Sequence, residues 1–308
     1  MAQPQPGIIP QPNPFALFLV LRVRQPRTNG LAVAKVAAGI PALAKKVAAA
    51  DRNARLVYTV SFGSNFWDII SPGRRPASLR PFKAIQAGKL SAPSTGGDIL
   101  LHIISKRHDL NFELAMPIKD HLGNRVEAMD EVHGFRYLDT RDLTGFIDGT
   151  ENPKGRKRAP VALVGQEDPA FAGGSYVFTQ RYVHNLKKWA TLPARDQEKV
   201  IGRTKRDSKE LPEKAKPATA HISRVVIEED GEELEIVRHS FPYGTTSESG
   251  LFFIAYNKTP DIPEKMLSRM MGTSGDGLHD HLMDYTQAVS GANFFAPSLN
   301  MLKTLARK

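Results

Sequence analysis

The sequence predicts an α+β protein made of two related halves, each combining antiparallel strands with helices. The apolar run 99–104 is followed by a polar turn with a lysine and then by an Asp–aliphatic pair that opens a helix. The run 251–256, about half a chain later, is followed by the same pattern, and the strand candidate 15–22 matches 175–182 at a similar offset. Such repetition favours two similar domains, which we expect to join between 123 and 145.

The first half contains three short apolar runs that are typical of strands, at 15–23, 56–62 and 98–105. Residues 31–50 carry apolar side chains at helical spacing, and Pro41 is expected to kink this helix or to start a second helical piece. A second helix candidate covers 108–121 and is limited by Pro117. Glycines and prolines predict a loop over 63–81.

The second half repeats this order less clearly. Residues 175–182 and 251–256 are its strand candidates, and 196–202 is a helical region. Two long stretches, 150–174 and 203–220, have no regular period, and irregular stretches of this length inside a compact domain are usually functional or disordered. We expect the second stretch, dense in Lys, Glu and Pro, to wrap a ligand or the neighbouring surface.

The composition excludes several classes of function. The 308 residues include no cysteine, which rules out disulfides, thiolate metal sites, iron–sulfur clusters and cysteine nucleophiles. The net charge is +10, with basic clusters at 156–158, 187–188 and 203–206. Because no nucleic-acid-binding motif accompanies this charge, we expect no nucleic-acid partner and instead a surface that favours anionic small substrates.

The chain gives no sign of a membrane partner. Its first apolar run, 15–23, is too short to span a bilayer. Prolines and no basic residue precede this run, which is not the pattern of a signal peptide. The sequence therefore predicts a cytoplasmic protein.

One short stretch, 145–153, has the sequence Gly-Phe-Ile-Asp-Gly-Thr-Glu-Asn-Pro, in which two glycines bracket Asp148. Glycine permits backbone angles and close approaches that a side chain would block, so this loop can hold one carboxylate rigidly against a flat partner. Asp-Gly followed by Asn-Pro is also ordinary turn chemistry. The pattern alone leaves both interpretations open.

Three further features stand in the C-terminal half. His221 follows the Pro/Lys-rich stretch and precedes an apolar strand candidate, and Arg238 closes an apolar strand before a glycine-containing turn. The segment 277–286 is helix-like and contains His279, Asp280, His281 and Asp284. Taken singly, these features are a structural histidine, a salt-bridging arginine and a solvated helix face.

Taken together, the motifs resemble those of the dye-decolourising haem peroxidases, in their bacterial B-type branch. The segment 145–153 resembles the family signature Gly-x-x-Asp-Gly. The other matching segments follow in the family's order: 5–8, 96–103, 109–115, 202–205, His221, Arg238, 289–291 and 294–295. The resemblance implies two ferredoxin-like halves with antiparallel β-sheets and peripheral helices, with haem b bound mainly by the C-terminal half. We expect domains at 1–140 and 141–308.

The resemblance also implies a role for single residues. His221 matches the proximal ligand of the haem iron, Asp148 the distal acid–base residue and Arg238 the distal arginine. Arg203 matches a basic residue beside a haem propionate. These roles agree with elementary chemistry, because imidazole is a suitable axial ligand, a carboxylate moves a proton and a guanidinium stays cationic beside a leaving hydroxide.

Three more residues complete the predicted site. Thr150 and Ser240 are expected to contact the cofactor, and Ser240 stands where relatives often carry Asn. A carboxylate that accepts the other N–H of the axial histidine makes that ligand more basic. We expect Asp280 to fill this role, with Asp284 as the alternative.

The implied activity is oxidation of dyes and phenolic or other aromatic compounds by hydrogen peroxide, in one-electron steps through a ferryl intermediate. The alternative is a protein that handles haem or porphyrin, with incidental peroxidase activity. The family tends to associate, so a homo-oligomer is expected. Some B-type relatives are packed into encapsulin nanocompartments through a C-terminal tail, and we do not expect packaging here because no long tail follows 294–305.

Overall fold

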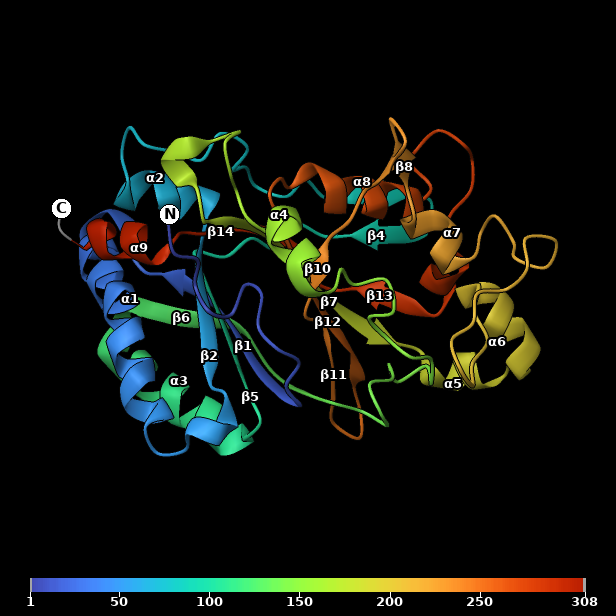
Figure 1. The fold of residues 1–308 in the computed structure, drawn as a ribbon, viewed down its shortest axis with the longest axis horizontal. Helices are drawn as coiled ribbons and strands as arrows, with labels where there is room; N and C mark the ends of the chain where they lie inside the picture. The colour runs from blue at the N-terminus through green and yellow to red at the C-terminus, as the bar shows by residue number, and fades with distance from the viewer. Residues whose placement is uncertain (1, 307–308) are drawn as a thin grey trace.

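The computed structural model describes residues 2–306, and its core is one antiparallel β-sheet to which both halves contribute (Figure 1). The strands run in the order β10-β12-β7-β14-β2-β5-β1-β6, with β11 and β13 paired to β12 and β7. Their bounds are β1 (Phe15–Val23), β2 (Val57–Gly63), β5 (Ile99–Ser105), β6 (Val126–Phe135), β7 (Ser175–His184), β10 (Val237–Arg238), β11 (Phe241–Gly244), β12 (Ser249–Asn257), β13 (Thr286–Ala288) and β14 (Ala292–Ala296). Two small hairpins, β3 (Ile85–Ala87) with β4 (Leu90–Ala92) and β8 (Glu228–Glu229) with β9 (Glu232–Glu233), lie apart from this sheet.

The two halves share one topology, which confirms the predicted fold class. In the first half the four long strands lie in the order β6-β1-β5-β2, so the first and third strands are central, and their neighbours are antiparallel. In the second half the order β10-β12-β7-β14 has the same form. This is the ferredoxin-like arrangement, in which each split pair of strands is joined by a crossover helix.

The helices lie around the sheet. Those of the first half are α1 (Pro26–Ala48), α2 (Ser64–Ile70), α3 (His108–Leu122), η1 (Arg52–Ala54) and η2 (Gly123–Arg125). Those of the second half are η3 (Gly155–Lys157), α4 (Arg158–Ala162), η4 (Pro169–Phe171), α5 (Leu186–Ala190), α6 (Ala194–Ile201), α7 (His221–Val225), α8 (Asp261–Met270), η5 (His281–Asp284) and α9 (Leu299–Leu305). No helix within residues 2–306 combines the length and the apolar character needed to cross a membrane.

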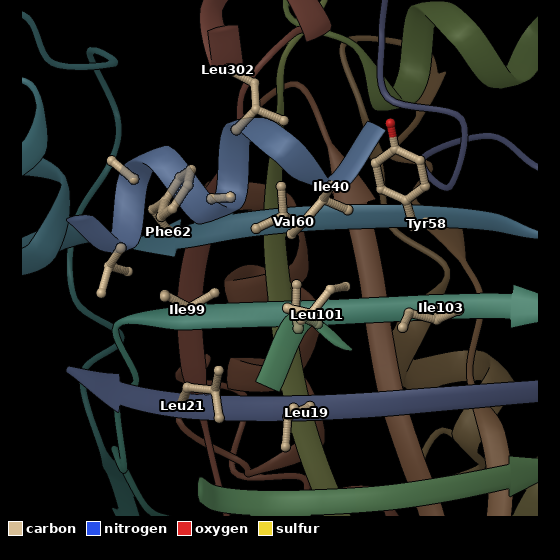
Figure 2. Packing of buried hydrophobic residues seen from close by; sticks show 14 of the residues in the cluster. Leu19, Leu21, Ile40, Tyr58, Val60, Phe62, Ile99, Leu101, Ile103 and Leu302 are labelled. Atoms are coloured by element: carbon tan, nitrogen blue, oxygen red, sulfur yellow. The ribbon is translucent and has the colours of Figure 1, made fainter. Parts of the chain in front are cut away.

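Strand β1 is apolar from Phe15 to Leu21 because both of its faces are covered. Its odd-numbered side chains, such as Leu19 and Leu21, join the core beneath α1 and α3 (Figure 2). Its even-numbered side chains before Arg22, such as Phe18, pack in a second core with residues of the other half, and the Phe18 ring stacks on Phe252 with centroids 4.1 Å apart. The part of β1 that is buried on both faces has no polar residue, and the one charged residue of the strand, Arg22, is exposed near its end.

The halves meet where β14 pairs with β2. Phe294 lies opposite Gly63 and Phe295 opposite Phe62, so the last strand of the chain joins the edge of the first half. Gly97 lies in the turn beside this junction with φ +147°, and a Cβ there would lie 2.7 Å from Val20 and 3.0 Å from Phe294. Only glycine permits both this conformation and this approach.

The two long helices of the first half, α1 and α3, each continue through a proline. The second helical piece predicted at Pro41 is wrong, because α1 runs from Pro26 to Ala48, and α3 passes Pro117 to reach Leu122. An internal proline removes one hydrogen bond. Burial of apolar residues on each side of it, such as Ile40 and Ala44 in α1, offsets that loss.

The predicted irregular segments differ from one another in the structure. The loop predicted over 63–81 is wrong in part, because it contains α2, whose Phe66, Trp67 and Ile70 are buried at helical spacing. The stretch 150–174 contains the short helices η3, α4 and η4, whereas 203–220 has no helix or strand in this structure.

The two ends of the chain pack on the first half. Helix α9 lies beside α1 (Figure 1), and its Leu302 and Leu305 belong to the core beneath that helix. Gln5 is fully buried, and its amide bonds the backbone of Val60 in β2 at 2.8 Å in both directions and the carbonyl of Pro297 at 2.9 Å. One side chain therefore ties the N-terminal segment, β2 and the segment before α9 together.

The Gln5→Ala variant is expected to lose about 1–3 kcal/mol of unfolding free energy, because it leaves buried backbone groups without partners. Urea unfolding followed by circular dichroism measures this loss. Gln11→Ala, at an exposed glutamine of the same segment, is the control and is expected to unfold like the parent protein. Equal midpoints for both variants would contradict the role assigned to Gln5.

Candidate active site

A large cavity with mostly apolar walls lies in the second half of the molecule. Its walls come from α7, α8, β7, β10, β12, η5 and the segment 142–151. The apolar lining includes Phe146, Ile147, Ile222, Leu234, Phe253, Met266 and Met283. The charged lining residues include Asp148, Glu151, Arg203, His221 and Arg238. The cavity therefore offers a broad apolar surface to a flat ligand and a few charged groups at fixed places.

His221 is the first residue of the short helix α7, so the strand predicted directly after it is wrong. Its Nδ1 lies 2.6 Å from Oδ2 of Asp280, a carboxylate that is fully buried. No hydrogen bond of Nε2 occurs within residues 2–306, and the ring lines the cavity. A buried carboxylate fixes the tautomer of an imidazole and leaves the other ring nitrogen free as a ligand.

Asp280 uses both of its oxygens. Oδ2 bonds His221, and Oδ1 accepts the backbone N–H of Leu282 at 2.8 Å as the N-cap of η5. The predicted helix over 277–286 is therefore wrong, because its only helical part is the one-turn η5 that this cap begins. Asp284, the alternative partner, is 41% exposed and lies 3.2 Å from His279 instead.

Asp148 and Arg238 form an ion pair at the cavity, with 3.1 Å between Oδ1 and Nη1. Oδ1 of Asp148 also accepts the N–H of Gly149 at 2.7 Å. Neither Oδ2 of Asp148 nor Nη2 of Arg238 has a hydrogen-bond partner in the part of the chain that the structure describes. The carboxylate therefore has one oxygen, and the guanidinium one nitrogen, that can bind a ligand in the cavity.

The loop of Asp148 is held in place by its neighbours. Asn152 bonds both the N–H and the C=O of Arg238 at 2.8 Å, which joins the loop to β10. Gly145 and Gly149 have φ values of +89° and +76°. Both interpretations of the glycine-bracketed motif therefore apply, because the segment turns sharply and also presents its carboxylate to the cavity.

The remaining predicted residues separate into two groups. Arg203 and Thr150 line the cavity, and Arg203 pairs with Glu151 and donates to the Ser208 carbonyl at 2.6 Å. The Nε of Arg203 is buried and has no hydrogen-bond partner within the described chain. Ser240 does not line the cavity, and its hydroxyl lies 3.4 Å from the N–H of Ile254.

A buried row of hydrogen-bonded polar side chains, which the sequence did not reveal, lies at another part of the cavity wall. His184, the last residue of β7, lies 3.1 Å from Asp142 through Nε2 and 2.7 Å from the hydroxyl of Thr286 through Nδ1. Asp142 also accepts the N–H and the hydroxyl of Thr144. The Asp-x-Thr spacing, typical of an Asx turn, is the signal that marks Asp142 in the sequence.

Comparison with known proteins identifies the family. The model of the Dyp-type peroxidase N-terminal domain matches residues 5–136, and that of the C-terminal domain matches residues 139–301. The chain belongs to the Dyp-type peroxidase family. It is therefore a dye-decolourising peroxidase, a haem peroxidase by class.

Individual members of the Dyp-type family cover nearly the whole chain. The dye-decolorizing peroxidase of Mycolicibacterium paratuberculosis is 42% identical over 303 residues, which are 97% of this chain and 85% of that protein. A variant of Rhodococcus jostii DypB, solved in complex with heme, is 41% identical with a TM-score of 0.95 and 98% coverage of both chains. The encapsulated DyP-type peroxidase of Mycobacterium smegmatis is 40% identical with a TM-score of 0.94 and also 98% coverage of both chains. Encapsulation is a property of that relative, and for this chain the absence of packaging stays a prediction.

Replacing Asp142 by Asn is expected to change how stability depends on pH. Burial alone raises the pKa of Asp142, but hydrogen bonds from His184 and Thr144 outweigh burial and lower its pKa below the usual value. Since the folded-state pKa is depressed, the stabilisation is present at neutral pH and is lost as the pH falls below about 5. The variant is expected to lose about 1–3 kcal/mol at neutral pH and to show a flatter acid dependence.

Urea unfolding over a range of pH measures both effects. Asp120→Asn, at an exposed carboxylate of α3, is the control and is expected to keep the parent's pH dependence. If the unfolding free energy of both the Asp142 and the Asp120 variant followed the pH in the same way as that of the parent, the hydrogen bonds of Asp142 would not contribute to stability.

Proposed function

We propose that this Dyp-type peroxidase binds haem b and uses hydrogen peroxide to oxidise dyes and phenolic or other aromatic compounds by one-electron steps. We also propose that the protein belongs to the B-type branch. Its alignment with Rhodococcus DypB covers 98% of both chains, which leaves no room for a large insertion in either. The observation that carries the function is a single cavity lined by His221, with its buried partner Asp280, and by the Asp148–Arg238 pair.

The residues of the cavity fit a haem. The free Nε2 of His221 is the ligand atom for iron, and the apolar walls suit the porphyrin faces. The unpartnered Nε of Arg203 supports binding of a propionate, since a buried guanidinium N–H needs an acceptor. Bound haem supplies an iron that takes oxidising equivalents from peroxide and passes them on one electron at a time.

Asp148 and Arg238 have complementary tasks in this proposal. Cleavage of hydrogen peroxide requires a proton to move from one oxygen to the other, and Oδ2 of Asp148 is free to accept and return it. Arg238 stays cationic and stabilises the negative charge that develops on the departing oxygen. Because the ion pair fixes both side chains before peroxide arrives, little reorganisation is needed.

A groove next to the cavity supports anionic aromatic substrates. We call it the lysine groove; its rim carries Lys89, Lys187 and Lys188, and it shares His184, Met283 and Thr286 with the cavity wall. The Nζ of Lys188 lies 4.9 Å from the centre of the Tyr285 ring in this groove. Lysines attract sulfonate or carboxylate groups, and an aromatic ring offers a face on which a dye can stack.

A line of aromatic rings joins the lysine groove to the cavity. Tyr285 packs edge-on against the buried Trp189 with ring centroids 5.2 Å apart. Trp189 packs in the same way against Phe146 of the cavity wall, at 6.1 Å. We propose that Tyr285 and Trp189 carry electrons from a bulky substrate that cannot enter the cavity.

The competing function is haem or porphyrin handling, which also uses His221 but has no need of the Asp148–Arg238 pair. The Arg238→Leu variant separates the two, because its reaction with peroxide is expected to slow by about 10²–10³-fold. Stopped-flow absorbance of the haem-loaded protein mixed with peroxide measures this rate.

Arg22→Leu is the matched control, since Arg22 is an exposed arginine that pairs with Glu127 on the first half. It is expected to react like the parent protein. An unchanged rate in Arg238→Leu, with haem still bound, would remove the peroxidase mechanism and favour haem handling.

Tyr285→Phe is expected to reduce oxidation of a bulky sulfonated dye several-fold while leaving oxidation of a small phenol unchanged. The hydroxyl is required because a tyrosine gives up an electron and a proton together, whereas phenylalanine does not. Steady-state rates with the two substrates at equal peroxide measure the effect. Tyr137→Phe, at a tyrosine that lines neither the cavity nor the lysine groove, is the control. Equal losses for the dye and the phenol would contradict the proposed route.

A further inference from the structure

Two histidines and an aspartate gather on the outer side of η5. His279, His281 and Asp284 each offer one ligand atom, and these atoms all lie within 4.8 Å of one another. His279 is half-buried and the other two are exposed. The peroxidase mechanism uses none of the three, because the hydrogen-bonding partner of His221 is Asp280, which lies between the two histidines in the chain.

The separations suit a small divalent metal ion. Around a tetrahedral zinc with bonds of about 2.0–2.1 Å, neighbouring ligand atoms lie about 3.4 Å apart. His279 Nε2 and Asp284 Oδ1 are already 3.2 Å apart. The His281 ring centroid lies 5.2 Å from that of His279, and its Nδ1 has only a long contact of 3.4 Å to Thr219. A small rotation of this exposed ring completes a three-residue site.

The kind of donor atom selects the class of metal. Two imidazoles and one carboxylate are ligands for Zn²⁺ and similar first-row divalent ions, whereas Ca²⁺ and Mg²⁺ prefer oxygen ligands throughout. The neighbouring cation, Lys188, donates to the backbone carbonyl of Asp284 at 2.9 Å. The carboxylate of Asp284 has His279 as its partner.

We propose that His279, His281 and Asp284 form a binding site for a divalent transition metal of the zinc type, separate from the cavity. Three ligands leave the fourth position of a tetrahedral ion for water. The metal joins both ends of η5, since His279 precedes the turn and Asp284 ends it. This turn carries the Asp280 carboxylate on its inner side, so the bound metal stiffens the support of His221.

The test is zinc binding by the haem-loaded protein after treatment with a chelator, measured by isothermal titration calorimetry with zinc chloride. The parent protein is expected to bind one zinc ion. His281→Ala is expected to weaken binding by about tenfold or more, because even the loss of an outer partner of a metal ligand costs that much. Asp284→Asn is expected to act in the same direction.

His133→Ala is the matched control. His133 also lies beside a histidine and an acidic residue, but its two ring nitrogens bond His108 and Glu131 separately, at 3.0 and 3.1 Å, so the three groups do not converge on one point. Its zinc binding is expected to equal that of the parent.

Thermal unfolding gives a second readout, since a ligand that binds only the folded state raises the unfolding temperature. Zinc is expected to raise this temperature in the parent and in His133→Ala, and to raise it clearly less in His281→Ala at the same zinc concentration. Zinc binding that is absent from the parent, or unchanged in both His281→Ala and Asp284→Asn, would overturn the proposal. These readouts report metal binding, so they are independent of whether the cavity performs peroxidase chemistry.

Discussion

The hydrogen bond between His221 Nδ1 and Asp280 Oδ2 is the constraint on which the candidate site depends. A carboxylate buried without a partner is costly, so Asp280 keeps the imidazole in one tautomer and one orientation. The same carboxylate begins η5 through its other oxygen. The position of the proposed iron ligand and the local backbone are therefore fixed by one side chain.

The fold makes this arrangement possible by separating rigid and irregular parts. The continuous sheet and the two cores beside β1 hold β7, β10 and β12 in register. Arg238 is the last residue of β10, and the other functional groups come from segments outside these strands: the loop of Asp148, the start of α7 and the turn η5. This division is common, because loops carry chemistry while a packed scaffold fixes their ends.

The sequence predicted β1, β2, β5, β7 and β12, because apolar runs that are buried on both faces leave a clear signal, but it gave no prediction for β6 and β14. It failed where packing overrides local preference, since α1 and α3 pass through Pro41 and Pro117. For the site, motif order identified Asp148, His221 and Arg238, and the structure brings all three to one cavity. The sequence did not decide between Asp280 and Asp284, because that choice depends on which carboxylate turns inward. It also did not reveal the hydrogen bonds that join Asp142, His184 and Thr286, because they connect residues far apart in the sequence. Sequence alone does not contain that information.

The most direct test of the account concerns the bond from His221 to its proposed iron. Resonance Raman spectroscopy of the reduced haem protein measures the iron–histidine stretching frequency, which rises as the imidazole gains negative charge. A carboxylate that accepts the ring N–H raises the basicity of the ligand. We expect a high frequency in the parent and a clear decrease in Asp280→Asn with haem still bound. The same frequency in both proteins would contradict this expectation.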